Sequence, residues 1–140
     1  MAVEKIVLDT NIVLDVFVFS DAQAKPLLQA LQGGSLQWIA TLPMRDELER
    51  VLAYRNIAQR LNYYGLLAEQ VLAQFDAMAH IVAVAAKAPV TCKDTDDQKF
   101  IDVAVAHQAR LLSKDNAVLC MKKRLQALSV QVQVAIGDPL

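Results

Sequence analysis

Cysteine, histidine and glycine are scarce in this chain of 140 residues, and each shortage excludes a class of site. The two cysteines are too few for a disulfide framework, and with the two histidines they lack the spacing of a metal site. Of the four glycines, Gly33 and Gly34 are adjacent, but the Gly-rich spacing and the Lys-Ser/Thr pair of a phosphate-binding loop are missing. The pair predicts the end of a helix instead.

Long apolar runs and targeting signals are also missing. No apolar run reaches the roughly 18 residues that would indicate a membrane span. The first residues show no basic stretch that leads into an apolar segment with a small-residue cleavage site, so the sequence predicts no signal peptide. Because cysteines are few as well, we expect a cytoplasmic protein that does not contact a membrane.

The charges are nearly balanced, with 14 basic and 15 acidic residues and a net charge of −1. This excludes a protein that holds nucleic acid by bulk charge alone, but not a nuclease whose basic patch offsets an acidic site. Apolar residues make up 55% of the chain, which predicts a folded protein. The length is typical of one domain and no linker interrupts it, so we expect a single domain over residues 1–140.

Short apolar, often β-branched runs alternate with longer helical patterns along the chain. The strands are expected at residues 5–8, 36–40, 81–84, 110–113 and 130–135. The helices are expected at 21–32, after Thr41, at 65–79, from Asp96 or Asp97 to His107, and at 117–128. This alternation indicates an α/β protein, a three-layer α/β/α sandwich around a mostly parallel sheet of four to five strands.

Four acidic residues fall where such a sheet collects ligands. Asp9 follows the first strand directly, and Asp115 comes two residues after the fourth. Asp97 lies in the first turn of the helix that leads into the fourth strand, and Glu47 in the second turn of the helix after the second strand. Ligands of open parallel sheets bind outside the carboxyl ends of the strands, where the strand order reverses. We therefore expect the four carboxylates to converge at this edge.

Four converging carboxylates repel one another and need protons or a cation between them. A hard divalent ion such as Mg²⁺ or Mn²⁺ suits ligands that are all oxygen. Such an ion lowers the pKa of a bound water and stabilises charge on a phosphodiester. The predicted reaction is in-line attack of a metal-activated water on phosphorus. Taken singly, each of these acids also fits a helix cap or a solvated helix face, and only the set of four indicates this chemistry.

Four segments resemble one known family, in the order in which they occur. Val7-Leu8-Asp9-Thr10-Asn11 looks like the opening motif of PIN domains, and the segment from Glu47 to Leu52 resembles the helix with the family's second acid. Asp97 to Ala104 resembles the helix with the third acid, and Leu112-Ser113-Lys114-Asp115 the fourth segment. The resemblance covers nearly the whole chain and implies the PIN fold and a metal-dependent ribonuclease.

Roles carried over from the family fall on particular residues. The resemblance implies four catalytic acids that hold Mg²⁺ or Mn²⁺: Asp9, Glu47, Asp97 and Asp115. It implies three hydrogen-bonding groups that support them: Thr10, Asn11 and Ser113. The run from Cys92 to Asp97 also resembles a bacterial subgroup of PIN toxins, which implies an RNA substrate and an antitoxin partner and allows a homodimer.

Neighbouring acids compete for the same roles. Asp96 adjoins Asp97, and Asp102 lies about 140° from Asp97 around the helix at roughly 100° per residue, which makes it a secondary candidate. Helical phase does not separate Glu47 from the acids on either side of it, Asp46 and Glu49. Asp15 is interpreted as a surface residue or a support to the site, and Asp94 as a solvated turn residue.

Basic residues near these acids are interpreted either as solvated surface or as phosphate ligands. They are Lys93, Lys99, Lys114, Arg45 and Arg50. The single tryptophan, Trp38, lies in an expected buried strand, so a core position is favoured over base stacking.

Two other functions remain alternatives. A related DNA nuclease is disfavoured because the chain has no room for a DNA-binding arch. A non-catalytic metal- or phosphate-binding domain, such as a receiver, would need an aspartate after the third strand, where Ala85-Ala86-Lys87-Ala88 stands.

Overall fold

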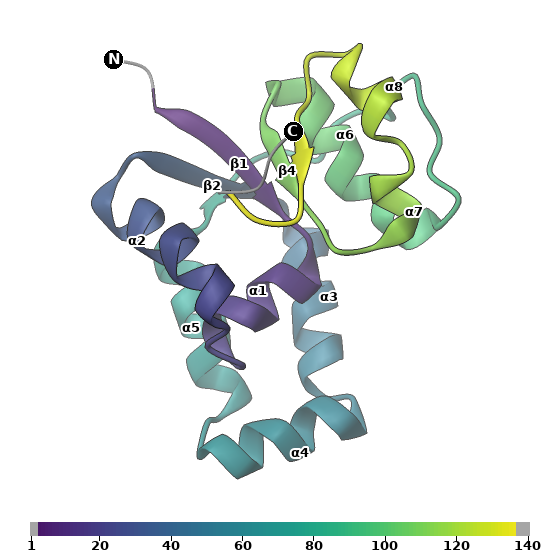
Figure 1. The fold of residues 1–140 in the computed structure, drawn as a ribbon. Coiled ribbons are helices and arrows are strands. Elements are labelled where there is room, and N and C mark those ends of the chain that lie inside the picture. The colour runs from purple at the N-terminus through teal and green to yellow at the C-terminus, as the bar shows by residue number, and fades with distance from the viewer. Residues whose placement is uncertain (1–2, 137–140) are drawn as a thin grey trace.

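Buried apolar and β-branched residues form the centre of a parallel sheet of five strands, with helices on both sides (Figure 1). A computed structural model describes residues 3–136. In the order β3-β2-β1-β4-β5 the strands are β3 (His80–Ile81), β2 (Leu36–Ala40), β1 (Glu4–Leu8), β4 (Arg110–Leu112) and β5 (Val132–Gln133). All four pairings are parallel. The arrangement confirms the predicted three-layer α/β/α sandwich.

The helices form two groups on opposite sides of the sheet, as right-handed connections between parallel strands require (Figure 1). The group that connects β1, β2 and β3 comprises α1 (Thr10–Phe17), the 3₁₀ turn η1 (Ala22–Ala24), α2 (Lys25–Gly33), α3 (Leu42–Leu52), α4 (Arg55–Tyr64) and α5 (Ala68–Met78). The other group comprises the 3₁₀ turn η2 (Thr95–Asp97), α6 (Gln98–His107), α7 (Asn116–Leu119) and α8 (Lys122–Gln126). Within residues 3–136, no helix is long and apolar enough to cross a membrane.

The strand order reverses beside β1, which positions the site. The chain leaves β1 toward β2 on one side, while β4 pairs with β1 on the other, with Leu8 opposite Leu112. The backbone N–H of Asp9 donates to the carbonyl oxygen of Leu112 at 3.0 Å, so the ends of β1 and β4 are held together. A crevice at this reversal point is where open α/β sheets bind ligands.

Trp38 on β2 belongs to the core, as predicted. Its side chain is 1% exposed. The ring of Phe75 from α5 meets it edge-on at 4.9 Å between centroids, and Phe17 from α1 lies 5.9 Å away. These aromatic contacts join α1 and α5 to the sheet through one side chain.

Two helices were not predicted, and β3 is shorter than predicted. α1 begins directly after Asp9, and α4 occupies a stretch where the sequence suggested no element. β3 covers only His80–Ile81, and the expected continuation to residue 84 is wrong because Val84 is 67% exposed and outside the sheet. A strand that buries neither face there has nothing to stabilise it.

Other elements differ in their bounds as well. The helix expected over 117–128 is two short helices, α7 and α8, separated at Cys120 and Met121. The strand expected over 130–135 is reduced to β5. The helix expected over 21–32 starts as the 3₁₀ turn η1 and continues as α2. Gly34 caps the end of α2 with a φ of 82°, a left-handed conformation that favours glycine.

Candidate functional site

Asp9 is buried at the junction of β1 and α1. Its side chain caps α1 by accepting a hydrogen bond from the backbone N–H of Asn11 at 3.1 Å. Its second oxygen, Oδ2, accepts from the hydroxyl of Ser113 at 2.7 Å. Only 4% of Asp9 is exposed, so this carboxylate is held in one orientation at the edge of the sheet.

Ser113 and Asp115 follow β4 and complete the neighbouring wall. The Ser113 hydroxyl accepts from the backbone N–H of Asp115 at 3.0 Å while it donates to Asp9. The Asp115 side chain in turn caps α7 through the backbone N–H of Ala117 at 2.9 Å. One buried hydroxyl therefore ties the ends of β1 and β4 together and sets the spacing of the two acids.

Asp97 and Asp94 approach from η2 at the start of α6. One ligand oxygen from each of Asp94, Asp97 and Asp115 lies within 4.8 Å of the other two. Asp94 caps η2 by accepting from the backbone N–H of Asp96 at 3.0 Å. Residues three apart in a 3₁₀ turn lie on the same side, which explains why Asp94 and Asp97 face together. Asp94 is exposed in a turn, as the sequence indicated, and in addition it belongs to this cluster.

The pKa of Asp97 is raised from 3.8 to about 8. Burial is the largest cause, followed by a hydrogen bond to Asp115 that exists only when Asp97 carries a proton, and then by the charges of Asp9 and Asp115. Burial also raises the pKa of Asp9, although the Ser113 hydroxyl and the Asn11 N–H stabilise its charged form. Without a cation, Asp97 therefore retains its proton near neutral pH.

Glu47 faces the cluster from α3 but already has two partners. Its carboxylate accepts a hydrogen bond from the hydroxyl of Thr10 and forms an ion pair with Lys99 at 2.6 Å. It lies close enough to Asp9 to contribute to the raised pKa of that residue. The structure thus brings Glu47 to the same edge as the other predicted acids, with its charge balanced by a lysine.

The carboxylates fit a divalent cation by their chemistry and by one unsatisfied atom. Oδ2 of Asp97 is buried and has no hydrogen-bond partner among the described residues. A buried acceptor without a donor costs about 1 to 3 kcal/mol, and a proton or a cation removes that cost. An all-carboxylate donor set suits Mg²⁺ or Mn²⁺, and the exposed Asp94 leaves one side open to water and substrate.

Only some of the residues predicted to support the acids or to bind substrate contact the acids through their side chains. Thr10 and Ser113 contact Glu47 and Asp9, whereas Asn11 contributes only its backbone N–H because its side chain is exposed. Lys99 lies beside Glu47, and Lys93 is exposed without a hydrogen bond or ion pair to residues 3–136. Lys99 therefore lies near the acids, and Lys93 lies in the loop that leads to Asp94.

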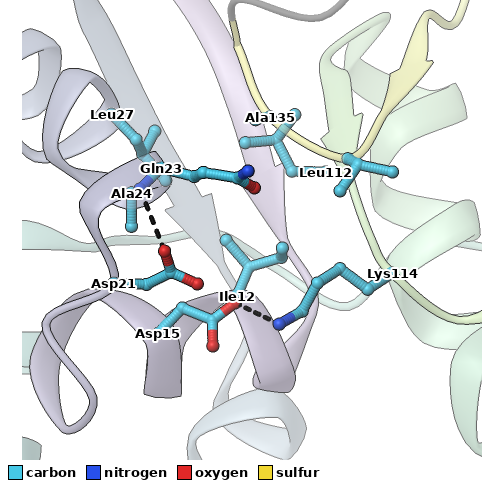
Figure 2. Close-up of a pocket in the computed structure, with 10 residues that line it drawn as sticks. Ile12, Asp15, Asp21, Gln23, Ala24, Leu27, Leu112, Lys114 and Ala135 are labelled. Atoms are coloured by element: carbon cyan, nitrogen blue, oxygen red, sulfur yellow. Dashed lines mark hydrogen bonds and ion pairs between the residues drawn. The ribbon is translucent and has the colours of Figure 1, made fainter.

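Lys114 points to a different pocket, as Figure 2 shows. Its ammonium group forms a 2.5 Å ion pair with the buried carboxylate of Asp15, and Asp21 and Ile12 line the same hollow. Adjacent residues of an extended chain point in opposite directions, so Lys114 turns away from the side on which Ser113 meets Asp9. Asp15 is therefore a buried partner of Lys114.

Asp102 secures a loop and lies outside the acidic cluster. Its Oδ1 accepts from the backbone N–H of Ala88 and from the side-chain amide of Gln98, both at 2.8 Å. Gln98 also binds the loop at Val90 and Cys92. These bonds hold the irregular segment that precedes Asp94, so Asp102 acts on the site through the loop. Asp96 is exposed, and its carbonyl oxygen accepts from Lys99.

Comparison with known proteins adds two findings. The model of a family described as PIN domain matches residues 5–117. A chain in the crystal structure of VapBC2 from Rickettsia felis, bound to a DNA fragment from their promoter, has a similar fold with a TM-score of 0.62 at 15% sequence identity. That match covers 91% of this chain and 98% of the other. No curated protein matches the sequence significantly.

Proposed function

The chain belongs to the PIN-domain family, and on that premise we propose that it is a Mg²⁺- or Mn²⁺-dependent endoribonuclease acting on single-stranded RNA. Members of this family are typically nucleases. We further propose that residues 1–140 act as one nuclease domain, with Asp9, Glu47, Asp97 and Asp115 as its acids and Asp94 beside them.

One observation carries the proposal, namely the buried and unpartnered Oδ2 of Asp97 among other carboxylates. Like charges at this spacing are unfavourable unless protons or a cation lie between them. Asp97, Asp115 and Asp94 would hold the ion, and Asp9 would add a negative charge beside it. A divalent ion there would activate a bound water and stabilise charge developing on the phosphodiester.

The remaining residues position these acids. Ser113 fixes Asp9 from one side, and Thr10 and Lys99 fix Glu47 from the other. Ser113 is 0% exposed and uses its hydroxyl in two hydrogen bonds, so it does not reach a substrate as a nucleophile. Direct hydrolysis without a covalent intermediate is the reaction that this arrangement favours. Lys99 and Lys93 are the proposed contacts to RNA phosphates.

The proposed biological role is that of a toxin restrained by an antitoxin protein. The similar fold of a chain in the VapBC2 crystal structure supports this proposal, as does the resemblance of Cys92 to Asp97 to PIN toxins. Induced expression of the chain in a bacterial host is expected to stop growth, because free nuclease would degrade cellular RNA. Growth equal to that of cells expressing an Asp9→Asn variant would contradict the toxin role.

The proposed reaction is tested with purified protein and a labelled single-stranded RNA. We expect cleavage with Mn²⁺ or Mg²⁺ and none in excess EDTA, because without a cation no bound water is activated for attack. Attack by water leaves the 2′-hydroxyl unused, so the products should carry no 2′,3′-cyclic phosphate. Electrophoresis of the products beside an alkaline ladder distinguishes the two product types.

Single-stranded DNA and double-stranded RNA of the same sequence serve as comparison substrates. Preferential cleavage of DNA would contradict the ribonuclease proposal and indicate a DNA nuclease with the same metal chemistry. Cleavage that persists in EDTA, or that yields cyclic phosphates, would contradict the proposed mechanism.

A further inference from the structure

A second surface, distant in sequence from the acids, has an unusual composition. Residues 50–68 contain three arginines and no acidic residue, in a chain whose net charge is −1. All three tyrosines of the chain lie in this segment, Tyr54, Tyr63 and Tyr64. Arg50, Arg55 and Arg60 form no ion pair with any acid in residues 3–136. The positive charge of the segment is therefore free to attract a polyanion.

The tyrosine rings of this segment are open to solvent. Tyr63 is 82% exposed, Tyr54 56% and Tyr64 43%. Exposed aromatic rings next to unpaired arginines are what proteins use to bind single-stranded nucleic acids, by stacking on bases and by contacting phosphates. All three tyrosines lie within one arginine-rich segment, which is not the distribution expected of unrelated surface tyrosines.

α4 presents Arg55 and Tyr63 on one outward face. Ile57 and Leu61 are its buried residues, and they fix the opposite side of the helix against the protein. Arg55, Gln59 and Tyr63 are spaced by four residues, so they form one exposed row on the face away from Ile57 and Leu61. The face that remains for a ligand is therefore polar, basic and aromatic.

The position of α4 connects this row to the acidic site. Figure 1 shows α4 at the end of the molecule farthest from the sheet. α3 and α5 connect α4 to the sheet. α3 also carries Glu47, and its last residue, Leu52, lies roughly 8 Å beyond Glu47 along the helix axis. The guanidinium of Arg60 stacks 5.1 Å from the ring centroid of Phe19, which holds α4 against the segment after α1. α3 therefore links the helix that carries this row to an acid at the edge of the sheet.

We propose that the exposed row Arg55, Gln59 and Tyr63 on α4, with Tyr54, binds single-stranded RNA on one side of the cleavage point. This inference rests on the proposed ribonuclease activity and extends it to a binding surface for flanking nucleotides. The tyrosines stack on bases without reading their identity, and Arg55 contacts phosphate. A second copy of the chain is disfavoured as the occupant, because two such faces would bring unpaired arginines together.

The test measures binding of fluorescein-labelled single-stranded RNA of about 16 nucleotides by anisotropy, in EDTA so that no cleavage occurs. Tyr63→Ala should weaken binding about tenfold or more, whereas Tyr63→Phe, which keeps the ring, should bind as wild type. Arg55→Ala should lower the slope of log affinity against log salt by about 0.7. Arg124→Ala removes the same charge from an exposed position of α8 and should leave both quantities unchanged.

Each alternative result has a distinct meaning. Wild-type affinity in both Tyr63→Ala and Arg55→Ala would overturn the inference. The same is true if light scattering shows that Tyr63→Ala converts a dimer into a monomer while RNA affinity stays unchanged, because the face would then join two copies. Wild-type protein that binds RNA through α4 but cleaves none with Mn²⁺ would contradict the proposed function and leave the binding surface supported.

Discussion

Replacing Asp9 by asparagine is expected to lower the rate of RNA cleavage by at least about a thousandfold. Asparagine retains the size of the side chain, and its carbonyl oxygen can still accept from Asn11 or Ser113, so the fold should survive. What is lost is a buried negative charge beside Asp115 and Glu47 that helps to hold a cation. The measurement is kcat/KM on labelled RNA at saturating Mn²⁺.

Glu69→Gln provides the matched control for Asp9→Asn. Glu69 is an exposed carboxylate on α5 outside the acidic cluster, so its loss changes the net charge by the same amount. Circular dichroism should show that both variants are folded. If Asp9→Asn retains activity within tenfold of wild type while Glu69→Gln behaves as wild type, Asp9 is not part of the catalytic machinery.

Asp97→Asn is expected to stabilise the metal-free protein at neutral and alkaline pH, although it should abolish cleavage. The folded-state pKa of Asp97, about 8, lies above its ordinary value of 3.8. Between these two pH values the folded protein therefore binds one more proton at Asp97 than the unfolded chain does. The free energy of unfolding is greatest below about pH 4 and falls as the pH rises from 4 to 8. Asparagine carries no such charge and does not lose this stability.

The two free energies of unfolding should therefore agree near pH 4 and differ increasingly toward pH 8. We expect a gap of about 2 to 4 kcal/mol in favour of Asp97→Asn at pH 8, with EDTA present, from urea denaturation. Parallel pH profiles for the two proteins would show that Asp97 is not confined among other carboxylates. A lower stability of the variant at every pH would assign Asp97 a purely structural role.

Much of the sheet is predictable from the sequence because its central strands are buried. The predicted range 36–40 matches β2. Leu36, Trp38 and Ile39 form a short apolar run between turn signals, a pattern that is typical of a buried strand. α1 was not predicted. Ile12, Val13, Leu14 and Val16 are all buried, and a short apolar run with β-branched residues fits a strand as well as a helix.

The acids were predictable as a set, but their partners were not. Strand ends and helix starts place Asp9, Asp97 and Asp115 at one edge whatever the side chains around them. That Lys99 pairs with Glu47 depends on how α6 and α3 pack, which no local pattern contains. The direction of Lys114, in contrast, follows from alternation after β4 and could have been predicted from the sequence.

The most direct test of the central claim is calorimetric titration of the protein with Mn²⁺ near pH 7, in two buffers of different ionisation enthalpy. The difference between the buffers measures the protons released on binding. Because Asp97 is mostly protonated at this pH and must lose its proton to a cation, we expect binding with release of on the order of one proton. In Asp97→Asn the binding should weaken and the proton release should disappear. Absence of Mn²⁺ binding, or equal binding by the variant without any change in proton release, would contradict a metal site at this cluster.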